Sequence, residues 1–184
     1  MGRVMGRGKP ASAATPATAL LVATGTRHTV HVYDHDPRAV ADGLGYGAEA
    51  AAALGVDPAR VYKTLVVSVE AVGSRDRLGV AVLPVEARLD LRAVATALSG
   101  RRAALADSAL AQRTTGYVAG GISPLGQRRA LPTVVDVSAL RHPTVLVSGG
   151  RRGLDVELSP GDLITLTAAS TAPITAGSGH RATR

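Results

Sequence analysis

The sequence predicts a single mixed α+β domain, in which a mostly antiparallel, barrel-like sheet is flanked by short helices. Two observations lead to this fold class. Segments that alternate between apolar and polar residues are interspersed with short capped helices, without a regular βαβ repeat. In addition, 184 residues of which 46% are hydrophobic can bury one sizeable core. Because aromatic residues make up only 2% of the chain, we expect that core to consist of Ala, Val and Leu.

The domain is expected to span residues 15–172. Residues 1–14 are rich in Gly, Ala and Arg and are predicted to be a disordered basic leader, and residues 173–184 a disordered tail. No apolar run approaches the roughly 20 residues that a membrane span needs. We therefore expect a soluble cytoplasmic protein that makes no membrane contact.

The first elements are predicted from capping and turn residues. Thr15 and Pro16 supply an N-cap and a first helical position, so a short helix begins there and ends at Gly25. Residues 28–35 alternate as a strand. After a loop, residues 46–55 form an Ala-rich helix ended by glycine.

A hairpin follows in the centre of the chain. Residues 60–70 and 78–85 read as strands, and the turn at residues 73–76 joins them in an antiparallel pair. Helices capped by Asp90 and Asp107 come next. The segment from 116 to 132, with its several glycines and two prolines, cannot be regular throughout.

The last third of the chain predicts further strands and one helix. Residues 133–138 and 144–148 read as strands, and the Gly-rich turn at 149–153 leads into a strand at 154–158. Ser159 is an N-cap with an acidic residue three positions later, which predicts a final helix.

One lysine stands out within the strand at 60–70. Alternation places Lys63 on the same, more apolar face as Val61 and Leu65, whereas Thr64 points to the opposite face. Of 21 basic residues only Lys9 and Lys63 are lysines. Lysine, unlike arginine, offers a compact charge and an amine whose pKa falls readily on burial. The pattern leaves two interpretations open: a cation facing a cleft, or a lysine that extends along apolar surface to solvent.

Cysteine and charge restrict the possible chemistry. The chain contains no Cys, so disulfides, thiolate-bound zinc and a protein thiol nucleophile are excluded. The net charge of +7 is weak evidence for nucleic acid, because five of the 21 basic residues lie in the two ends and leave 16 against 14 acidic residues. Three arginine doublets could reach phosphates, or could be ordinary solvated charge: 101–102, 128–129 and 151–152.

Two other segments could form a binding site. The glycines at 120 and 121, stiffened by Pro124, could turn backbone N–H groups into a small pocket and polarise a carbonyl, although a purely structural turn is the alternative. Ser123 lacks the Gly-x-Ser-x-Gly setting of a hydrolase nucleophile. A tight hairpin brings Ser148 and Asp155 to one edge, which suits a pocket for an amino group.

The segment "HVYDHDP" crowds His31, Tyr33, Asp34, His35 and Asp36 together. Metal binding is conceivable, but no HExxH-like spacing occurs and Asp36 followed by proline is typical of a turn. We therefore predict no metal and no cofactor.

Seven segments, taken in order, resemble the YbaK/EbsC family, and more closely its bacterial Cys-tRNA(Pro) deacylase branch, over about residues 15–168: "TPA", "YDHDP", "YGAEAAAALG", "VYKTLVV", "VLPVEARLDL", "QRTTGYVAGGISPLGQRRALPTVVD" and "VSGGRRGLDVELSPGDL". The resemblance implies a barrel-like sheet homologous to the editing domain of prolyl-tRNA synthetases. It implies hydrolysis, in trans, of the ester that joins cysteine to tRNA(Pro), or to tRNA(Cys), with the substrate's own thiol attacking the ester. Mischarged tRNA(Pro) and prolyl-tRNA synthetase are the implied partners.

The same resemblance implies the roles of individual residues. Lys63 matches the family's catalytic lysine, which positions the tRNA 3′ end. Further residues match those that shape the pocket or hold the aminoacyl group: Tyr33, Tyr46, Thr64, Gly120, Gly121, Ile122, Ser123, Pro124, Ser148 and Asp155. Arginines in the loops are expected to contact tRNA phosphates: Arg128, Arg129, Arg151 and Arg152.

Two departures from the family bear on specificity. Tyr46 stands where relatives often have Phe, and the loop before it is a few residues longer than expected. The alternatives are therefore a deacylase for another small amino acid and a non-catalytic tRNA- or nucleotide-binding module. A metal hydrolase that uses His31 and His35 is a third.

Overall fold

The computed structural model describes residues 14–38, 45–71 and 77–177. Their strands form one eight-stranded sheet in the order β1-β7-β6-β2-β3-β5-β8, with β4 joined to β2. The strands are β1 (His28–Val32), β2 (Val61–Ala71), β3 (Arg77–Pro84), β4 (Gly100–Leu105), β5 (Thr133–Asp136), β6 (Val145–Arg151), β7 (Leu154–Leu158) and β8 (Ser170–Ala172).

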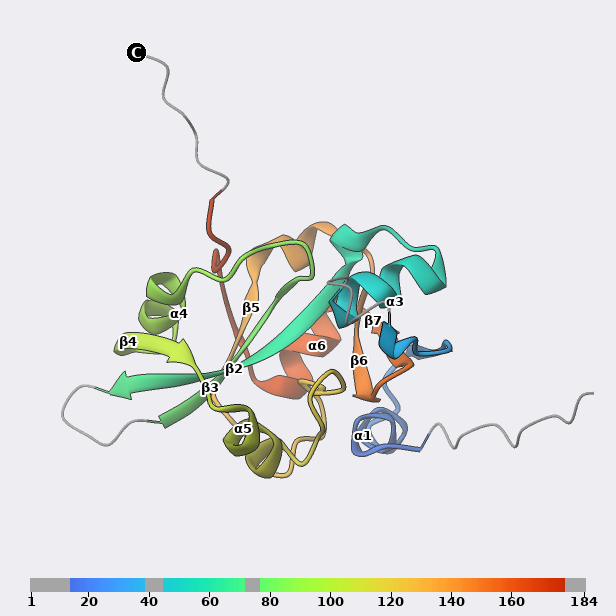
Figure 1. The fold of residues 1–184 in the computed structure, drawn as a ribbon, viewed down its shortest axis with the longest axis horizontal. Coiled ribbons are helices and arrows are strands. Elements are labelled where there is room, and N and C mark those ends of the chain that lie inside the picture. The colour runs from blue at the N-terminus through green and yellow to red at the C-terminus, as the bar shows by residue number, and fades with distance from the viewer. Residues whose placement is uncertain (1–13, 39–44, 72–76, 178–184) are drawn as a thin grey trace, which may run out of the picture.

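The sheet is mixed and curled, as the sequence predicts. Pairs β1/β7, β2/β3, β2/β4 and β6/β7 are antiparallel, and β2/β6, β3/β5 and β5/β8 are parallel. Within the described part of the chain, three strands pair with a single neighbour and so form edges, namely β1, β8 and β4, and the curled sheet is a half-barrel. β2 crosses the molecule from α3 to the end that carries β4 and α4 (Figure 1).

The helices confirm the predicted caps. They are α1 (Pro16–Ala23), α3 (Tyr46–Leu54), α4 (Leu91–Ala97), α5 (Ser108–Thr115) and α6 (Pro160–Thr167), with 3-10 turns η1 (Pro58–Arg60) and η2 (Val137–Arg141). The side chains of Thr15, Asp90, Asp107 and Ser159 each accept a hydrogen bond from a backbone N–H in the first turn. These bonds satisfy donors that the helix cannot pair internally.

The two faces of β2 contact different parts of the core, which confirms the predicted alternation. Val67 and Val69 pack in a cluster with α4, whereas Tyr62 and Val66 belong to the main core between the sheet, α1 and α6. Near the start of β2, Val61 packs in a small third cluster under α3. Lys63 therefore lies on the face that α3 covers.

Three features differ from the sequence prediction. The doublet at 101–102 lies in β4, because hydrogen bonds to β2 form an edge strand from a segment without a clear strand pattern. β8 was also missed. The folded part continues beyond residue 172, since Ile174 is fully buried and its carbonyl accepts from Asp90 N at 2.8 Å. Residues 1–13, 178–184 and the predicted turn at 73–76 lie outside the described residues.

Within the described ranges, none of the helices has both the length and the apolar character needed to cross a bilayer.

Candidate active site

A pocket of about 500 Å³ opens where β2, β6 and β7 meet the first turn of α3. Its volume lies in the range of small-ligand sites, roughly 300–1,000 Å³. Eight residues predicted from the sequence line it: Tyr33, Tyr46, Lys63, Thr64, Gly120, Ile122, Ser148 and Asp155. The remaining lining residues come mainly from α3 and β2: Gly45, Gly47, Ala48, Ala50, Val61, Tyr62, Leu65 and Val85.

The pocket exists because β2 changes its neighbour along one edge. Val61 and Tyr62 pair with β6, and residues 67–71 pair with β4. Among the described residues, no strand residue pairs with positions 63–65 on this edge. The backbone N–H and C=O groups of Tyr62 and Val66 point to this edge of β2. Tyr62 pairs there with β6, and Val66 O accepts a hydrogen bond from Ala106 N at 3.0 Å. By alternation, the backbone N–H and C=O of Thr64 point into the gap.

Thr64 has a second unusual feature. Its Oγ1 is buried and has no hydrogen-bond partner among the described residues. A buried hydroxyl without a partner costs free energy, which a ligand could recover by bonding to it.

Lys63 is held by the chain that follows β3. Its Nζ donates to Val85 O at 3.1 Å and to Ala87 O at 2.6 Å. Burial lowers the pKa of this ammonium below its ordinary value. Because an ammonium has three donors, these two carbonyls leave one N–H for a ligand in the pocket.

Ser148 and Asp155 face the same space as Lys63. They are directly paired between β6 and β7. Val61 is paired with Leu146 in the parallel β2/β6 ladder, so Lys63 and Ser148, two residues further along, share that face. Asp155 is only 5% exposed, and burial raises its pKa to about 6, an effect that the charge of His31 partly offsets.

Two tyrosines form the wall near α3. Burial, and then the nearby charges of Asp155 and Glu49, raise the pKa of Tyr33, so its phenol stays protonated at neutral pH. Tyr46 lies against the glycine loop: a Cβ on Gly120 would be 2.6 Å from the Tyr46 ring. Gly120 also has φ +81°, so both space and backbone conformation require glycine there.

The other three predicted residues of the glycine loop do not line the pocket. Gly121 packs against the backbone of Arg151, where a Cβ would be 2.7 Å from its Cα. Ser123 is fully buried, and its Oγ accepts from Leu125 N at 3.2 Å. Pro124 is buried as well. These three residues stabilise the conformation of the loop, because only part of a compact loop can face the pocket and the rest packs against the protein.

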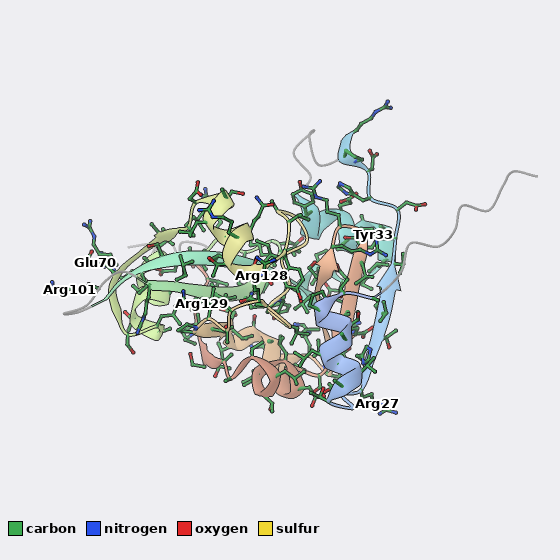
Figure 2. All side chains as sticks on the ribbon, turned by 90° about the horizontal axis from the view of Figure 1, so that it is seen from below. Arg27, Tyr33, Glu70, Arg101, Arg128 and Arg129 are labelled. Carbon is green, nitrogen blue, oxygen red and sulfur yellow. The ribbon has the colours of Figure 1, made fainter. Side chains whose placement is uncertain are left out.

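The arginines predicted to contact phosphates occupy different environments. Arg128 and Arg129 are exposed, and Figure 2 shows them between Tyr33 and the far end of the sheet, which carries Arg101. Arg151 is half-buried, and its Nε and Nη2 are buried without a hydrogen-bond partner among the described residues. Arg152 is exposed, and its guanidinium group lies over the Tyr46 ring.

The histidines of "HVYDHDP" pair with glutamates. His31 Nε2 donates to Glu157 at 2.8 Å, and His35 Nδ1 donates to Glu49 at 2.9 Å. Within the described ranges, no three His, Asp or Glu side chains gather in a way that could hold a metal ion.

Sequence reasoning missed Glu49 and the two carbonyls that hold Lys63. Glu49 had a signal, since it is the one charged residue in the Ala-rich helix at 46–54, and it is 5% exposed. The carbonyls of Val85 and Ala87 had none, because every residue carries such a group.

Comparison with known proteins gives a consistent result. Residues 45–166 match the aminoacyl-tRNA editing domain family. EbsC of Enterococcus faecalis, a protein assigned as a Cys-tRNA(Pro)/Cys-tRNA(Cys) deacylase, is 35% identical over 125 residues, which cover 68% of this chain and 74% of that protein.

Solved structures extend the similarity over more of the chain. A protein described as a trans-editing enzyme for prolyl-tRNA synthetase is similar with a TM-score of 0.70 and 25% identity, over 89% of this chain and 99% of that one. Hypothetical protein APE2540 is similar with a TM-score of 0.74 and 28% identity, over 88% of this chain and 100% of that one.

Proposed function

This chain belongs to the aminoacyl-tRNA editing domain family, in its YbaK/EbsC branch, and on that premise we propose that it is a trans-editing deacylase. It hydrolyses the ester between a wrongly attached amino acid and the 3′-adenosine of a tRNA. The substrate we propose is Cys-tRNA(Pro), with Cys-tRNA(Cys) as a second. Because tRNA is charged in the cytoplasm, we place the protein there.

One observation carries this proposal: a cation, a buried carboxyl and an unpaired strand edge surround one cavity. Lys63, Asp155 and Thr64 all line it, and its volume of about 500 Å³ suits an aminoacyl group with part of its nucleoside. The carboxylate of Asp155 can bind the α-ammonium group of the amino acid. That contact would offset the cost of burying the carboxylate.

The proposed reaction needs no nucleophile from the protein. The sulfur of the cysteinyl group bonds to the ester carbonyl carbon, and the bond from that carbon to the ribose oxygen breaks. The thiol proton passes to the ribose oxygen, which releases intact tRNA and a cyclic thioester that water then opens. A chain without Cys is compatible with this chemistry.

The protein supplies position and charge. In this proposal, the backbone N–H of Thr64 and the remaining N–H of Lys63 stabilise the carbonyl oxygen as it gains negative charge, and both residues line the pocket. Donors fixed in advance around such an oxyanion contribute about 10²–10³-fold each in other enzymes. Selectivity follows from the mechanism, because alanyl and prolyl esters contain no thiol.

A hydrolysis panel tests the proposal. Cys-, Ala-, Ser- and Pro-charged tRNA(Pro) are compared with Cys-tRNA(Cys), and release of the amino acid is followed over time. We expect rapid loss of cysteine and little loss of alanine, serine or proline. Equal hydrolysis of all esters would contradict thiol assistance, and no hydrolysis of any ester would favour a binding module.

A metal hydrolase that uses His31 and His35 predicts a different response. Under that mechanism EDTA abolishes turnover, whereas thiol-assisted cleavage is unaffected by the chelator. His31 bonds to Glu157 and His35 to Glu49, so one ring nitrogen of each histidine already has a partner, which supports the second outcome.

We also propose that a synthetase, namely prolyl-tRNA synthetase, supplies the choice of tRNA. Between the two ends of the chain, 16 basic residues stand against 14 acidic ones, which offers little general attraction for a polyanion. Purified protein should therefore bind different tRNAs with similar affinity. Strong discrimination between tRNAs without the synthetase would contradict this.

A further inference from the structure

The Tyr46 ring is the part of the pocket wall that three separate segments hold in place. Tyr46 is the first residue of α3. It follows the N-cap Gly45, which has no side chain to cap the helix. The ring is close enough to Gly120 that no Cβ fits between them. The position of the ring therefore determines how wide the pocket is between α3 and the glycine loop.

Arg152 contacts both sides of this opening. Its guanidinium carbon lies 5.2 Å from the centre of the Tyr46 ring, which is within the range of a cation–π interaction. Its Nε donates to Ala119 O at 2.9 Å, in the residue before Gly120. One side chain from the β6–β7 turn thus joins the glycine loop to the ring of α3.

A second group supports the ring from the chain after β1. The His35 ring lies 5.7 Å from the Tyr46 ring, centre to centre, at an interplanar angle of 32°. His35 Nδ1 donates to the buried carboxylate of Glu49, which also accepts from Asp36 N at 2.5 Å. Because Glu49 lies one turn after Tyr46 on α3, this bond keeps His35 beside the ring.

We propose that Arg152 is a specificity-determining positioning residue, which holds Tyr46 against the glycine loop and so limits the pocket to aminoacyl groups with a small side chain. This inference rests on the proposed deacylase function. It differs from a role for Arg152 in phosphate binding, because the Nε–H and the face of the guanidinium are directed at the protein. His35, fixed by Glu49, supports the ring but does not touch the glycine loop in any described contact.

The expected effect follows from the two interactions that a truncation removes. An exposed cation–π contact and one hydrogen bond are each modest, and together they correspond to about a tenfold change in an equilibrium constant. Without them Tyr46 can move away from Gly120, and the pocket admits longer side chains. The change should appear as lost discrimination rather than as lost folding.

The test uses nucleosides without phosphate. The probes are 3′-aminoacylamino-3′-deoxyadenosines that carry cysteine, alanine or leucine, in which an amide replaces the ester so that no turnover occurs. Dissociation constants are measured for the wild type, Arg152→Ala, Arg152→Lys and the control Arg27→Ala. Arg27 is exposed and lies immediately before β1, far from Tyr33 (Figure 2).

We expect Arg152→Ala to reduce the preference for cysteine and alanine over leucine about tenfold. Arg152→Lys should restore part of it, because an ammonium can also lie over the ring, and Arg27→Ala should leave it unchanged. Thermal unfolding curves of all variants should agree within a few degrees.

Two results would overturn the inference while the proposed function stands. One is an Arg152→Ala variant that binds all three probes as the wild type does but binds tRNA more weakly, since that is the behaviour of a phosphate contact. The other is an equal loss of affinity for every probe. A wild-type protein that binds none of the probes would overturn the proposed function and this inference with it.

Discussion

Asp155 and Glu157 lie two residues apart on β7 and share one face of the sheet, yet their environments are opposite. Glu157 accepts hydrogen bonds from Thr144, His31 and Arg60 at 2.5, 2.8 and 2.6 Å, and these partners, Thr144 above all, lower its pKa. Asp155 has no ion-pair partner among the described residues, and burial raises its pKa to about 6.

The difference separates a structural carboxylate from a candidate functional one. Glu157 connects β1, β7, η1 and the segment before β6, so its bonds stabilise the fold. Asp155 is buried at a cost in the free protein, and a cationic group of a ligand would reduce that cost. Variants of Asp155 should therefore lose activity without losing stability, and variants of the Glu157 cluster should lose stability and keep activity.

The largest effect is expected for Lys63→Ala. Removal of the ammonium should lower the rate of Cys-tRNA(Pro) deacylation by at least about 10²–10³-fold, because a fixed cation near the oxyanion is lost. Initial rates and thermal unfolding are measured together, and the melting temperature should change little. Near-normal turnover would contradict the site assignment. Lys63→Arg should not rescue activity, since a planar fork cannot replace a compact ammonium between two carbonyls.

Asp155→Asn sharpens the comparison through pH. A folded pKa of about 6, above the ordinary value of 3.8, means that the native state binds more protons than the unfolded state between these values. The contribution of Asp155 to stability therefore falls by about 2 kcal/mol as pH rises from 4 to 8, and the variant should lack this loss. Urea unfolding at pH 4 and pH 8 measures it.

The same variant should lose activity while it gains stability at pH 8. Wild-type kcat/KM should fall below about pH 6, where the carboxylate that binds the α-ammonium becomes protonated. An Asp155→Asn enzyme that keeps full activity with an unchanged acidic limb would remove Asp155 from the substrate site.

Glu157→Gln tests the structural member of the pair. Loss of the charge weakens three hydrogen bonds in a half-buried cluster, and we expect a cost of about 1–3 kcal/mol in the free energy of unfolding at pH 7. Deacylation should stay within about twofold of the wild type once the protein is folded. A large loss of activity at unchanged stability would place Glu157 in the site instead.

The smallest effect on stability is expected for Thr64→Val. Its buried Oγ1 has no partner among the described residues, so an isosteric methyl group should leave the free energy of unfolding unchanged or raise it by less than about 1 kcal/mol. Substrate affinity should fall a few-fold, seen in KM. Clear destabilisation with normal KM would show that the hydroxyl serves the fold.

The local elements could be predicted because their signals lie within a few residues. Thr15 with Pro16 marked α1, and Ser159 marked α6. The alternation of β2 assigned Lys63 to the correct face. β4 and β8 could not be predicted, because neither segment has a clear strand pattern and each owes its strand geometry to a neighbour distant in sequence.

The candidate site was predicted as a set of residue types and completed only by packing. The sequence by itself determined that Lys63 is the one internal lysine, that no thiol is available and that glycines occupy positions 120 and 121. Alternation and composition are properties of the chain and survive in any fold.

Only the tertiary structure decided which of these residues meet. It showed that β2 leaves β6 after Tyr62 and so exposes the backbone of Thr64, that two carbonyls hold Lys63, and that Arg152 lies over Tyr46. It also separated Asp155 from Glu157, although both carboxylates follow the same alternating pattern. Burial and long-range pairing determine these properties, because the pKa of a carboxyl group depends on the solvent and the partners around it. The alternating pattern of a strand does not reveal that solvent exposure or those partners.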